Sequence, residues 1–451
     1  MRSLTAYLER IPWFRDFVLP LVASPVRRRL AGGAFWSGLG GAASRIALLG
    51  SSFFLARVLG PEKFGEYGMV NATMGMLGAL GGFGVGTTVT RYVALLRNTD
   101  MERAGRILGL SSVITCISGG VLGVCFVLLA PFLAQATLAA PHLTSALRIA
   151  AISMALGVMN NTQQAALAGF EAFKTSAWLG AVCGVFQALA VCLGAYCSGV
   201  NGAIAGVTIA MMISVVLTRF AIKRQMRIAA LTFRLREIWS EWRVLVGFSL
   251  PAFLTMLVGW LIDWGCNVVL VNQPGGYGEL GMLNAANHWR AVVAFLPGLL
   301  CAAAMPVMSE RYGKTGKAER LQVMTNLMWV VSAVVVPVAL GICLAGPFIL
   351  RGYGMASESG IWVLVLTVSA AVIQSIVVPC WFYFFAEDRA WICFSMNGGL
   401  GVLTIGLAWL MIQHGALGLA AARCLAMAVH AGWIFVYAFH VMQFGSAPRK
   451  V

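Results

Sequence analysis

Long apolar runs, separated by short charged or Gly- and Pro-containing breaks, follow one another along most of this 451-residue chain. Hydrophobic residues make up 60% of the sequence and charged residues 11%, too few charges to cover a water-soluble surface of this size. A hydrocarbon core about 30 Å thick takes roughly 20 apolar residues per helical crossing. The sequence therefore predicts an all-α polytopic membrane protein of about twelve transmembrane helices, with no room for a large soluble domain.

The predicted helices divide into two sets of six. Reading apolar windows against the breaks gives the first six at residues 34–58, 66–95, 105–135, 145–170, 175–198 and 202–222. The second six lie at residues 245–272, 280–307, 322–350, 360–386, 390–413 and 415–440. We accordingly predict a cytoplasmic, in-plane N-terminal segment at residues 1–30. An N-terminal six-helix lobe at 31–222 and a C-terminal six-helix lobe at 244–440 are joined by a basic cytoplasmic linker at 223–243, and a cytoplasmic tail follows at 441–451.

Lysine and arginine are distributed unevenly between alternate loops. The net charge is +16, and most of it falls in the N-terminal segment, the linker, the tail and the loops at 96–106 and 311–320. The other side carries only Arg57, Lys63, Arg148 and Arg351. By the positive-inside rule both termini are predicted to be cytoplasmic, in a bacterial inner membrane, which requires an even number of crossings. Basic clusters confined to such loops argue against nucleic acid as a partner.

Several kinds of chemistry lack their signature residues in this sequence. The eleven cysteines show no CxxC or CxxH spacing, so neither disulfides nor a zinc site is predicted. The chain contains no phosphate-cradling nucleotide loop, no HExxH and no GxSxG. We therefore predict a transporter rather than an enzyme, with no metal and no cofactor.

One short segment occurs twice. Residues 64–72, FGEYGMVNA, return at residues 277–285 as YGELGMLNA, an offset of 213 residues. Six of the nine positions are identical and two more are similar in type. Both copies lie at the predicted external turn before the second helix of a set of six. The repeat predicts two lobes of six helices related by a pseudo-twofold axis along the membrane normal, an arrangement that commonly encloses a central substrate path.

Three ionisable residues fall inside predicted helices, where an arginine costs about 2.5–3.5 kcal/mol at mid-helix. They are Arg45 in the first helix, Asp263 in the seventh and Arg290 in the eighth. Asp263 and Arg290 are either a structural ion pair between two helices or part of a binding site. In the second case, Arg45 and Arg290 would make the cavity positive and bind a phosphate or pyrophosphate through planar guanidinium donors. Arg423, in the twelfth helix, is left unassigned.

Amide side chains recur in the apolar helices. Asn71, Asn284 and Gln164 are candidate ligands for sugar hydroxyls in the path. The alternative for each of them, and the interpretation that we favour for any one, is hydrogen bonding between helices, worth about 0.6–2 kcal/mol per bond.

Three segments resemble a known family. Residues 55–68, LARVLGPEKFGEYG, are similar to the ARxLGPxxFGxY pattern in the first external loop of polysaccharide flippases, with every fixed position matched. Residues 82–92, GFGVGTTVTRY, resemble the LGLGxxxxR segment that ends helix two, and residues 164–174, QAALAGFEAFK, resemble the end of helix four. The chain looks like the Wzx-type branch of the multidrug, oligosaccharidyl-lipid and polysaccharide exporter (MOP) superfamily, and the resemblance spans most of its first half.

The resemblance implies a MATE-like pair of lobes arranged in a V and a flippase that moves undecaprenyl-pyrophosphate-linked oligosaccharide outward by alternating access. It implies that Arg45 and Arg290 hold the pyrophosphate while the prenyl tail stays among membrane lipids. Polysaccharide polymerase or synthase components are further candidate partners. Transport could be driven by the membrane potential or by a proton or sodium ion carried on Asp263. One alternative is a drug or organic-cation antiporter of the same superfamily, which should line its path with carboxylates. A less favoured alternative is a membrane glycan transferase.

Overall fold

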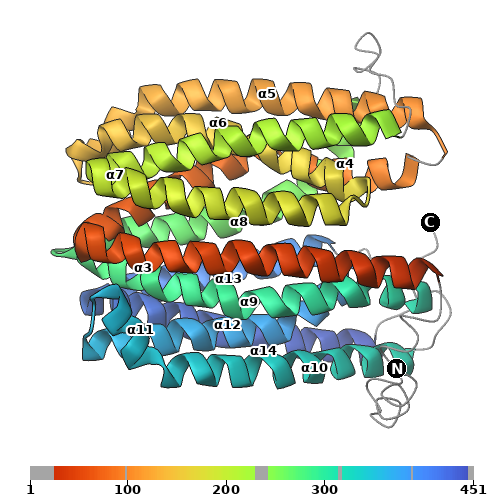
Figure 1. The fold of residues 1–451 in the computed structure, drawn as a ribbon. Coiled ribbons are helices and arrows are strands. Elements are labelled where there is room, and N and C mark those ends of the chain that lie inside the picture. Colours follow the sequence, from red (N-terminus) through yellow and green to blue (C-terminus); the bar gives the residue numbers. More distant parts are fainter. Residues whose placement is uncertain (1–24, 97–98, 229–241, 313–316, 387–389, 445–451) are drawn as a thin grey trace, which may run out of the picture.

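The computed structural model describes residues 25–96, 99–228, 242–312, 317–386 and 390–444. Within these ranges every regular element is helical, and the helices run roughly parallel to one another in a single bundle (Figure 1). The predicted all-α fold is therefore confirmed. The predicted in-plane segment before residue 25, most of the basic linker and the tail after residue 444 lie outside the described residues.

The first lobe is formed by helices α3 to α7. Their bounds are α3 Pro25–Gly82, α4 Val85–Leu96, α5 Met101–Phe132 with a π-helical turn η2 at Leu133–Thr137, η3 Pro141–Leu143, α6 Thr144–Gly169 and α7 Phe173–Ile228. Two of these helices are each a pair of arms joined at a kink. The chain leaves helical geometry at Gly60 in α3, with φ 76° and ψ 168°, and at Ser198 and Gly199 in α7. Gly60 can adopt this positive φ without a Cβ clash, and Pro61 suits the start of the second arm because it has no amide hydrogen to leave unpaired.

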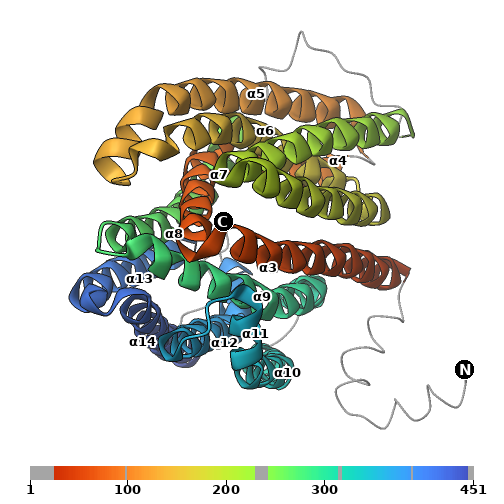
Figure 2. The same cartoon turned by 60° about the vertical axis from the view of Figure 1, so that its left-hand side comes forward.

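The second lobe repeats this order of helices. Its elements are α8 Trp242–Val271, α9 Gly276–Tyr312, α10 Lys317–Leu344, α11 Gly346–Tyr353, α12 Glu358–Ala386, α13 Ala390–Met411, η5 Ile412–His414 and α14 Gly415–Phe444. Figure 2 shows α5, α6 and α7 on one side of the molecule, the helices of the second lobe on the other, and α3 between them. Helix α3 packs against both α7 and α9, so it joins the two lobes.

The helices are long and apolar enough for a membrane protein. Seven stretches of the described residues meet the length and composition of a membrane span, and three of them are 45, 55 and 48 residues long. Because about 20 residues suffice for one crossing, each of these three is long enough for more than one. The predicted polytopic fold is confirmed, whereas the count of twelve crossings stays a prediction.

Some predicted boundaries are wrong in an informative way. The predicted second helix, 66–95, is interrupted at Phe83 and Gly84, which have φ of 43° and 65°. The predicted ninth helix, 322–350, ends at Leu344, and the short helix α11 follows it. The predicted loop between residues 58 and 66 is helical except at Gly60. Averaging hydropathy over a window locates the apolar segments, but it cannot detect a single residue with positive φ that interrupts the helix within such a segment.

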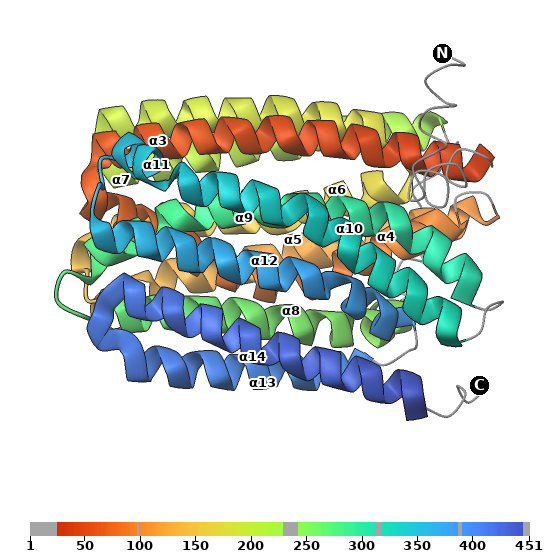
Figure 3. The same ribbon diagram turned by 90° about the horizontal axis from the view of Figure 1, so that it is seen from below.

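The bundle has two distinct ends. Helix α3 begins and helix α14 ends at the same end (Figure 3), here called the terminal end. The opposite end, called the distal end, carries the kink in α3 and the turn between α8 and α9. The two copies of the repeat meet there. A Cβ on Gly65 would overlap the carbonyl oxygen of Tyr277, and a Cβ on Gly281 would overlap that of Pro61. The glycines of the repeat thus allow the two lobes to approach backbone to backbone.

Hydrogen bonds in the distal half reinforce this contact between the lobes. Ser52 Oγ and the hydroxyl of Tyr353 are 2.7 Å apart, and both groups are buried. Further bonds run from Trp264 Nε1 to Thr73 Oγ1, 3.0 Å, and from the Tyr277 hydroxyl to the Leu138 carbonyl, 2.8 Å. The lobes are therefore tied together in the distal half of the bundle.

Candidate functional site

Three charged side chains meet inside the second lobe. Arg423 of α14 lies 3.2 Å from Asp263 of α8, measured from Nη2 to Oδ1. Arg290 of α9 lies 3.9 Å from the other carboxylate oxygen of Asp263. Arg423 also donates to the side-chain oxygen of Asn267, at 3.2 Å, and to the backbone carbonyl of Asp263, at 3.4 Å. The predicted pairing of Asp263 with Arg290 is thus present, but Arg423 is the closer partner.

A cavity of about 180 Å³ adjoins this cluster. Five helices of the second lobe line it, namely α8, α9, α12, α13 and α14. Besides the three charged residues, its polar lining consists of Asn287, Thr367, Gln374, Asn397 and Thr404. Two guanidinium groups against one carboxylate leave the cavity with a net charge of +1, surrounded by amides and hydroxyls that can donate or accept hydrogen bonds.

The two arginines differ in how firmly they are held. Arg423 has a side-chain exposure of 14% and makes three contacts with two residues of α8, whereas Arg290 is 34% exposed and has one long contact to Asp263. Asp263 itself is 48% exposed. Because an ion pair at 3.9 Å between partly exposed groups is weak, Arg290 keeps donors available for an anion, while Arg423 mainly holds Asp263 in place.

Arg45 lies in the first arm of α3, outside the lining of this cavity. Its guanidinium carbon is 4.0 Å from the centroid of the Phe295 ring on α9, a cation–π contact between the two lobes. Gly41 makes space for this ring, because a Cβ there would lie 2.9 Å from Phe295 Cε2. Phe295 follows Arg290 by five residues on α9, which places the two side chains on faces about 140° apart. The structure thus gives Arg45 and Arg290 separate surroundings rather than one shared clamp.

The candidate amides lie away from the charged cluster. Asn71 donates to the carbonyl of Tyr67 in its own helix, 2.8 Å away. Asn284 packs against Gly68 in the distal contact between the lobes. Gln164 accepts a hydrogen bond from Ser176, at 3.1 Å, and lies 3.5 Å from Thr218. Gln164 on α6 thus bonds to residues of α7, which is the hydrogen bonding between helices that we considered as the alternative to sugar binding. The structure does not place these three amides on the cavity of the second lobe.

Two features of the site escape an analysis of the sequence alone. The sequence leaves Arg423 unassigned because its depth depends on where the twelfth helix begins; its partner Asp263 lies 160 residues earlier, and only packing reveals that contact. Three amides that line the cavity, Asn287, Gln374 and Asn397, are not among the candidates taken from the sequence. The sequence feature that could have identified Gln374 and Asn397 is that they are polar residues within apolar helices of the same six-helix set as Asp263 and Arg290.

Two comparisons of the sequence with known proteins place the chain among polysaccharide-related membrane proteins. A family described as polysaccharide biosynthesis protein matches residues 30–311. The chain is also similar to the EPS I polysaccharide export inner membrane protein EpsE of Ralstonia solanacearum, with 24% identity over 403 residues that cover 86% of this chain and 89% of that protein.

Solved structures of transporters share the fold. A MOP superfamily transporter from Pyrococcus furiosus matches with a TM-score of 0.70 at 17% identity, covering 96% of this chain and 98% of that one. A multidrug resistance MATE family transporter in its inward-facing conformation matches with a TM-score of 0.70 at 16% identity, covering 89% of this chain and 96% of that one. A MATE family transporter in the outward-facing conformation matches with a TM-score of 0.65 at 17% identity, covering 96% of this chain and 98% of that one. The fold is thus that of membrane transporters, as predicted. Because the family match extends over more than half of the sequence, this chain belongs to the polysaccharide biosynthesis protein family.

Proposed function

We propose that this protein is a flippase that moves undecaprenyl-pyrophosphate-linked oligosaccharide from the cytoplasmic to the periplasmic leaflet for polysaccharide biosynthesis. The observation that carries the proposal is the positive, amide-lined cavity of the second lobe. Guanidinium groups suit a pyrophosphate because their planar donors match its oxygens. The surrounding amides and hydroxyls suit sugar hydroxyls, and the prenyl tail would stay in lipid. Polymerase or synthase components would receive the transferred glycan.

The distribution of charges supports an orientation with the terminal end in the cytoplasm. Among the described residues, the basic side chains of this end include Arg103, Arg106, Arg219, Lys223, Arg224 and Arg227. At the distal end, the basic side chains of the described residues are Arg57, Lys63, Arg148 and Arg351. This asymmetry is the one that the positive-inside rule associates with a cytoplasmic end. The distal contact between the lobes would then close the periplasmic side, and alternating access requires it to open.

A specific observation weighs against the antiporter. A path for organic cations should present carboxylates, but the one acid that lines the cavity, Asp263, lies within 4 Å of two arginines. A cation entering the cavity would meet a net positive charge. The antiporter therefore stays the second candidate, distinguished by experiment.

The test is transfer of a fluorescent undecaprenyl-pyrophosphate oligosaccharide across proteoliposomes that contain the purified protein. We expect Arg290→Ala to lower the initial rate by about 10- to 100-fold, because a charge-assisted hydrogen bond contributes roughly 1.5–3 kcal/mol. Arg148→Ala is the matched control, since Arg148 is exposed at the distal end and outside the cavity; its rate should equal that of the wild type. No transfer by the wild type, together with proton-coupled dye efflux, would instead identify an antiporter.

Arg45 gives a second, independent prediction. We expect Arg45→Ala to slow transfer about 5- to 30-fold, because it removes both a positive charge and a cation–π contact worth roughly 0.5–2 kcal/mol. Arg45→Lys keeps the charge and should retain most of the rate. Phe295→Leu separates the two contributions, since it removes the ring but leaves the charge. If Arg45→Ala transports at the wild-type rate, Arg45 has no part in holding the pyrophosphate.

A further inference from the structure

A second, larger cavity lies in the first lobe, outside the site discussed above. It is a groove of about 650 Å³ between α5, α6 and α7, and every residue that lines it belongs to this lobe. Much of its wall is apolar and includes Leu108, Val113, Ile222 and Met226. The groove is therefore large enough, and apolar enough, to hold part of an amphiphile.

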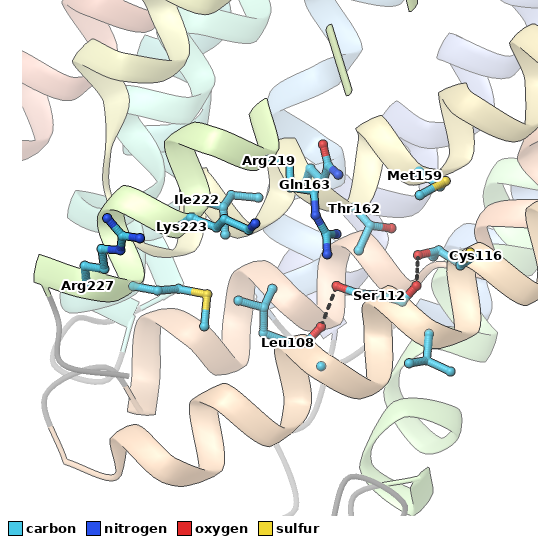
Figure 4. Close-up of a pocket in the computed structure, with 14 residues that line it drawn as sticks. Leu108, Ser112, Cys116, Met159, Thr162, Gln163, Arg219, Ile222, Lys223 and Arg227 are labelled. Atoms are coloured by element: carbon cyan, nitrogen blue, oxygen red, sulfur yellow. Dashed lines mark hydrogen bonds between the residues drawn. The ribbon is translucent and has the colours of Figure 1, made fainter. Parts of the chain in front are cut away.

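Three basic side chains follow one edge of the groove. Arg219, Lys223 and Arg227 are exposed, four residues apart and hence on one face of α7. Figure 4 shows them in order along this helix, with Leu108 and Ser112 of α5 across from them. No acidic residue lines the groove in the described part of the chain. The groove thus combines an apolar wall with an uncompensated positive edge.

The position of this edge along the helix fits the level of lipid headgroups. The second arm of α7, from Val200 to Ile228, is about 43 Å long, about 13 Å more than the hydrocarbon core of a membrane. Its last nine residues or so, 220–228, therefore extend beyond the hydrocarbon; they include Lys223 and Arg227, and Arg219 directly precedes them at the edge of the hydrocarbon. The depth expected for the cations is that of phospholipid phosphates.

The second lobe provides an internal comparison. Helices α10 and α12, which follow the order of α5 and α6, also line a groove, of about 270 Å³. Its described lining consists of Thr325, Met328, Trp329, Ser332 and Ile376, none of them ionisable. Both lobes thus form a groove at this place, and among the residues whose side chains are described, a positive edge lines the groove of the first lobe and not that of the second.

One buried polar atom in the groove lacks a partner. The side-chain oxygen of Gln163 has no hydrogen-bond partner, although the residue is 8% exposed and lines the groove. Buried polar atoms without a partner are uncommon, and this acceptor requires a donor such as a hydroxyl group. The ionised phosphodiester of a phospholipid has no proton to donate, whereas a hydroxyl elsewhere in the headgroup can donate one.

We infer that this groove is a binding site for an anionic phospholipid of the surrounding membrane, with a headgroup of the phosphatidylglycerol type. The phosphate contacts Arg219 and Lys223, the glycerol hydroxyl donates to Gln163, and one acyl chain lies along the apolar wall. Basic pockets between transmembrane helices on the cytoplasmic side bind anionic headgroups in this way. The site shares no lining residue with the cavity of the second lobe and does not depend on the identity of the transported molecule.

Native mass spectrometry of the full-length protein, released from nanodiscs that contain phosphatidylglycerol and phosphatidylcholine, tests the site. The readout is the ratio of the two lipids bound to the protein, relative to the bilayer. We expect the double variant Arg219→Gln/Lys223→Gln to lower the enrichment of phosphatidylglycerol by about fivefold for each charge removed. Arg224→Gln is the matched control, because Arg224 is exposed on the same helix turn but does not line the groove, and it should keep the wild-type enrichment.

Two further variants make the outcome specific. Arg219→Lys/Lys223→Arg keeps both charges and should keep the enrichment, which separates lost binding from a folding defect. Gln163→Leu should lower the preference for phosphatidylglycerol over phosphatidic acid, which lacks the glycerol hydroxyls, by about three- to tenfold. Equal enrichment in the wild type and Arg219→Gln/Lys223→Gln would overturn the site, as would an equal loss in Arg224→Gln. An unchanged preference in Gln163→Leu would overturn the assignment of the hydroxyl.

Discussion

Replacing Asp263 with alanine is expected to destabilise the protein by about 1–3 kcal/mol and to reduce transport more than tenfold. The substitution removes the one acid that lines the cavity and leaves two guanidinium groups without a counterion. Because Asp263 is 48% exposed, the loss is smaller than the roughly 3–5 kcal/mol measured when a fully buried pair is broken. The measurement is unfolding in detergent, followed by tryptophan fluorescence, together with the proteoliposome transfer assay.

A double-mutant cycle separates the ion pair from other effects of this substitution. Asp263→Ala/Arg423→Met should recover part of the lost stability, since the less exposed guanidinium is removed together with its partner. Glu358→Ala is the matched control for loss of an acid, because Glu358 is exposed in the first turn of α12, and its effect should stay below about 1 kcal/mol. A stability of Asp263→Ala equal to that of the wild type would show that the arginines need no counterion.

The fold was largely predictable because its signals are local or repeated. Apolar runs require no knowledge of packing, and the 64–72 and 277–285 repeat predicts two similar lobes. The structure adds that the two copies touch each other across the distal end, a contact that no periodic pattern encodes. Nothing in the sequence distinguishes Gly65 and Gly281 from the other glycines of the repeat, but the structure shows that each of them lies against a backbone carbonyl of the other lobe.

The candidate site was predictable only in part. An ionisable residue in an apolar helix is visible in the sequence, and Asp263 and Arg290 do face each other. Which of several charges lies nearest depends on helix rotation and tilt, which the sequence does not specify. Arg423 is therefore visible but could not be paired, and Arg45 was grouped with Arg290 although it lies over Phe295. The role of an amide is harder to predict than that of a charge, since an amide such as Gln164 can form its hydrogen bonds with a neighbouring helix, here with Ser176 of the same lobe.

The repeat also provides a matched pair of variants with a large expected difference. Gly65 and Gly278 occupy equivalent positions in the two copies. A Cβ on Gly65 would overlap the backbone carbonyl oxygen of Tyr277, whereas a Cβ on Gly278 would find its nearest neighbour, Glu62 Cγ, at 3.8 Å. We therefore expect Gly65→Ala to reduce transport more than tenfold and Gly278→Ala to leave it within about twofold of the wild type, since forced overpacking costs roughly 1–3 kcal/mol.

This difference tests whether the distal contact is a gate. The clash at Gly65 exists only while the lobes touch, so it shifts the population toward states in which they are apart, and about 1.4 kcal/mol changes that ratio tenfold. Alternating access requires both states, so a protein that cannot close its distal end transports slowly even with an intact charged cavity. Hydrogen exchange should show faster exchange at residues 61–72 and 277–289 in Gly65→Ala alone. If exchange there rises while transport stays normal, the contact is structural packing that the transport cycle does not use.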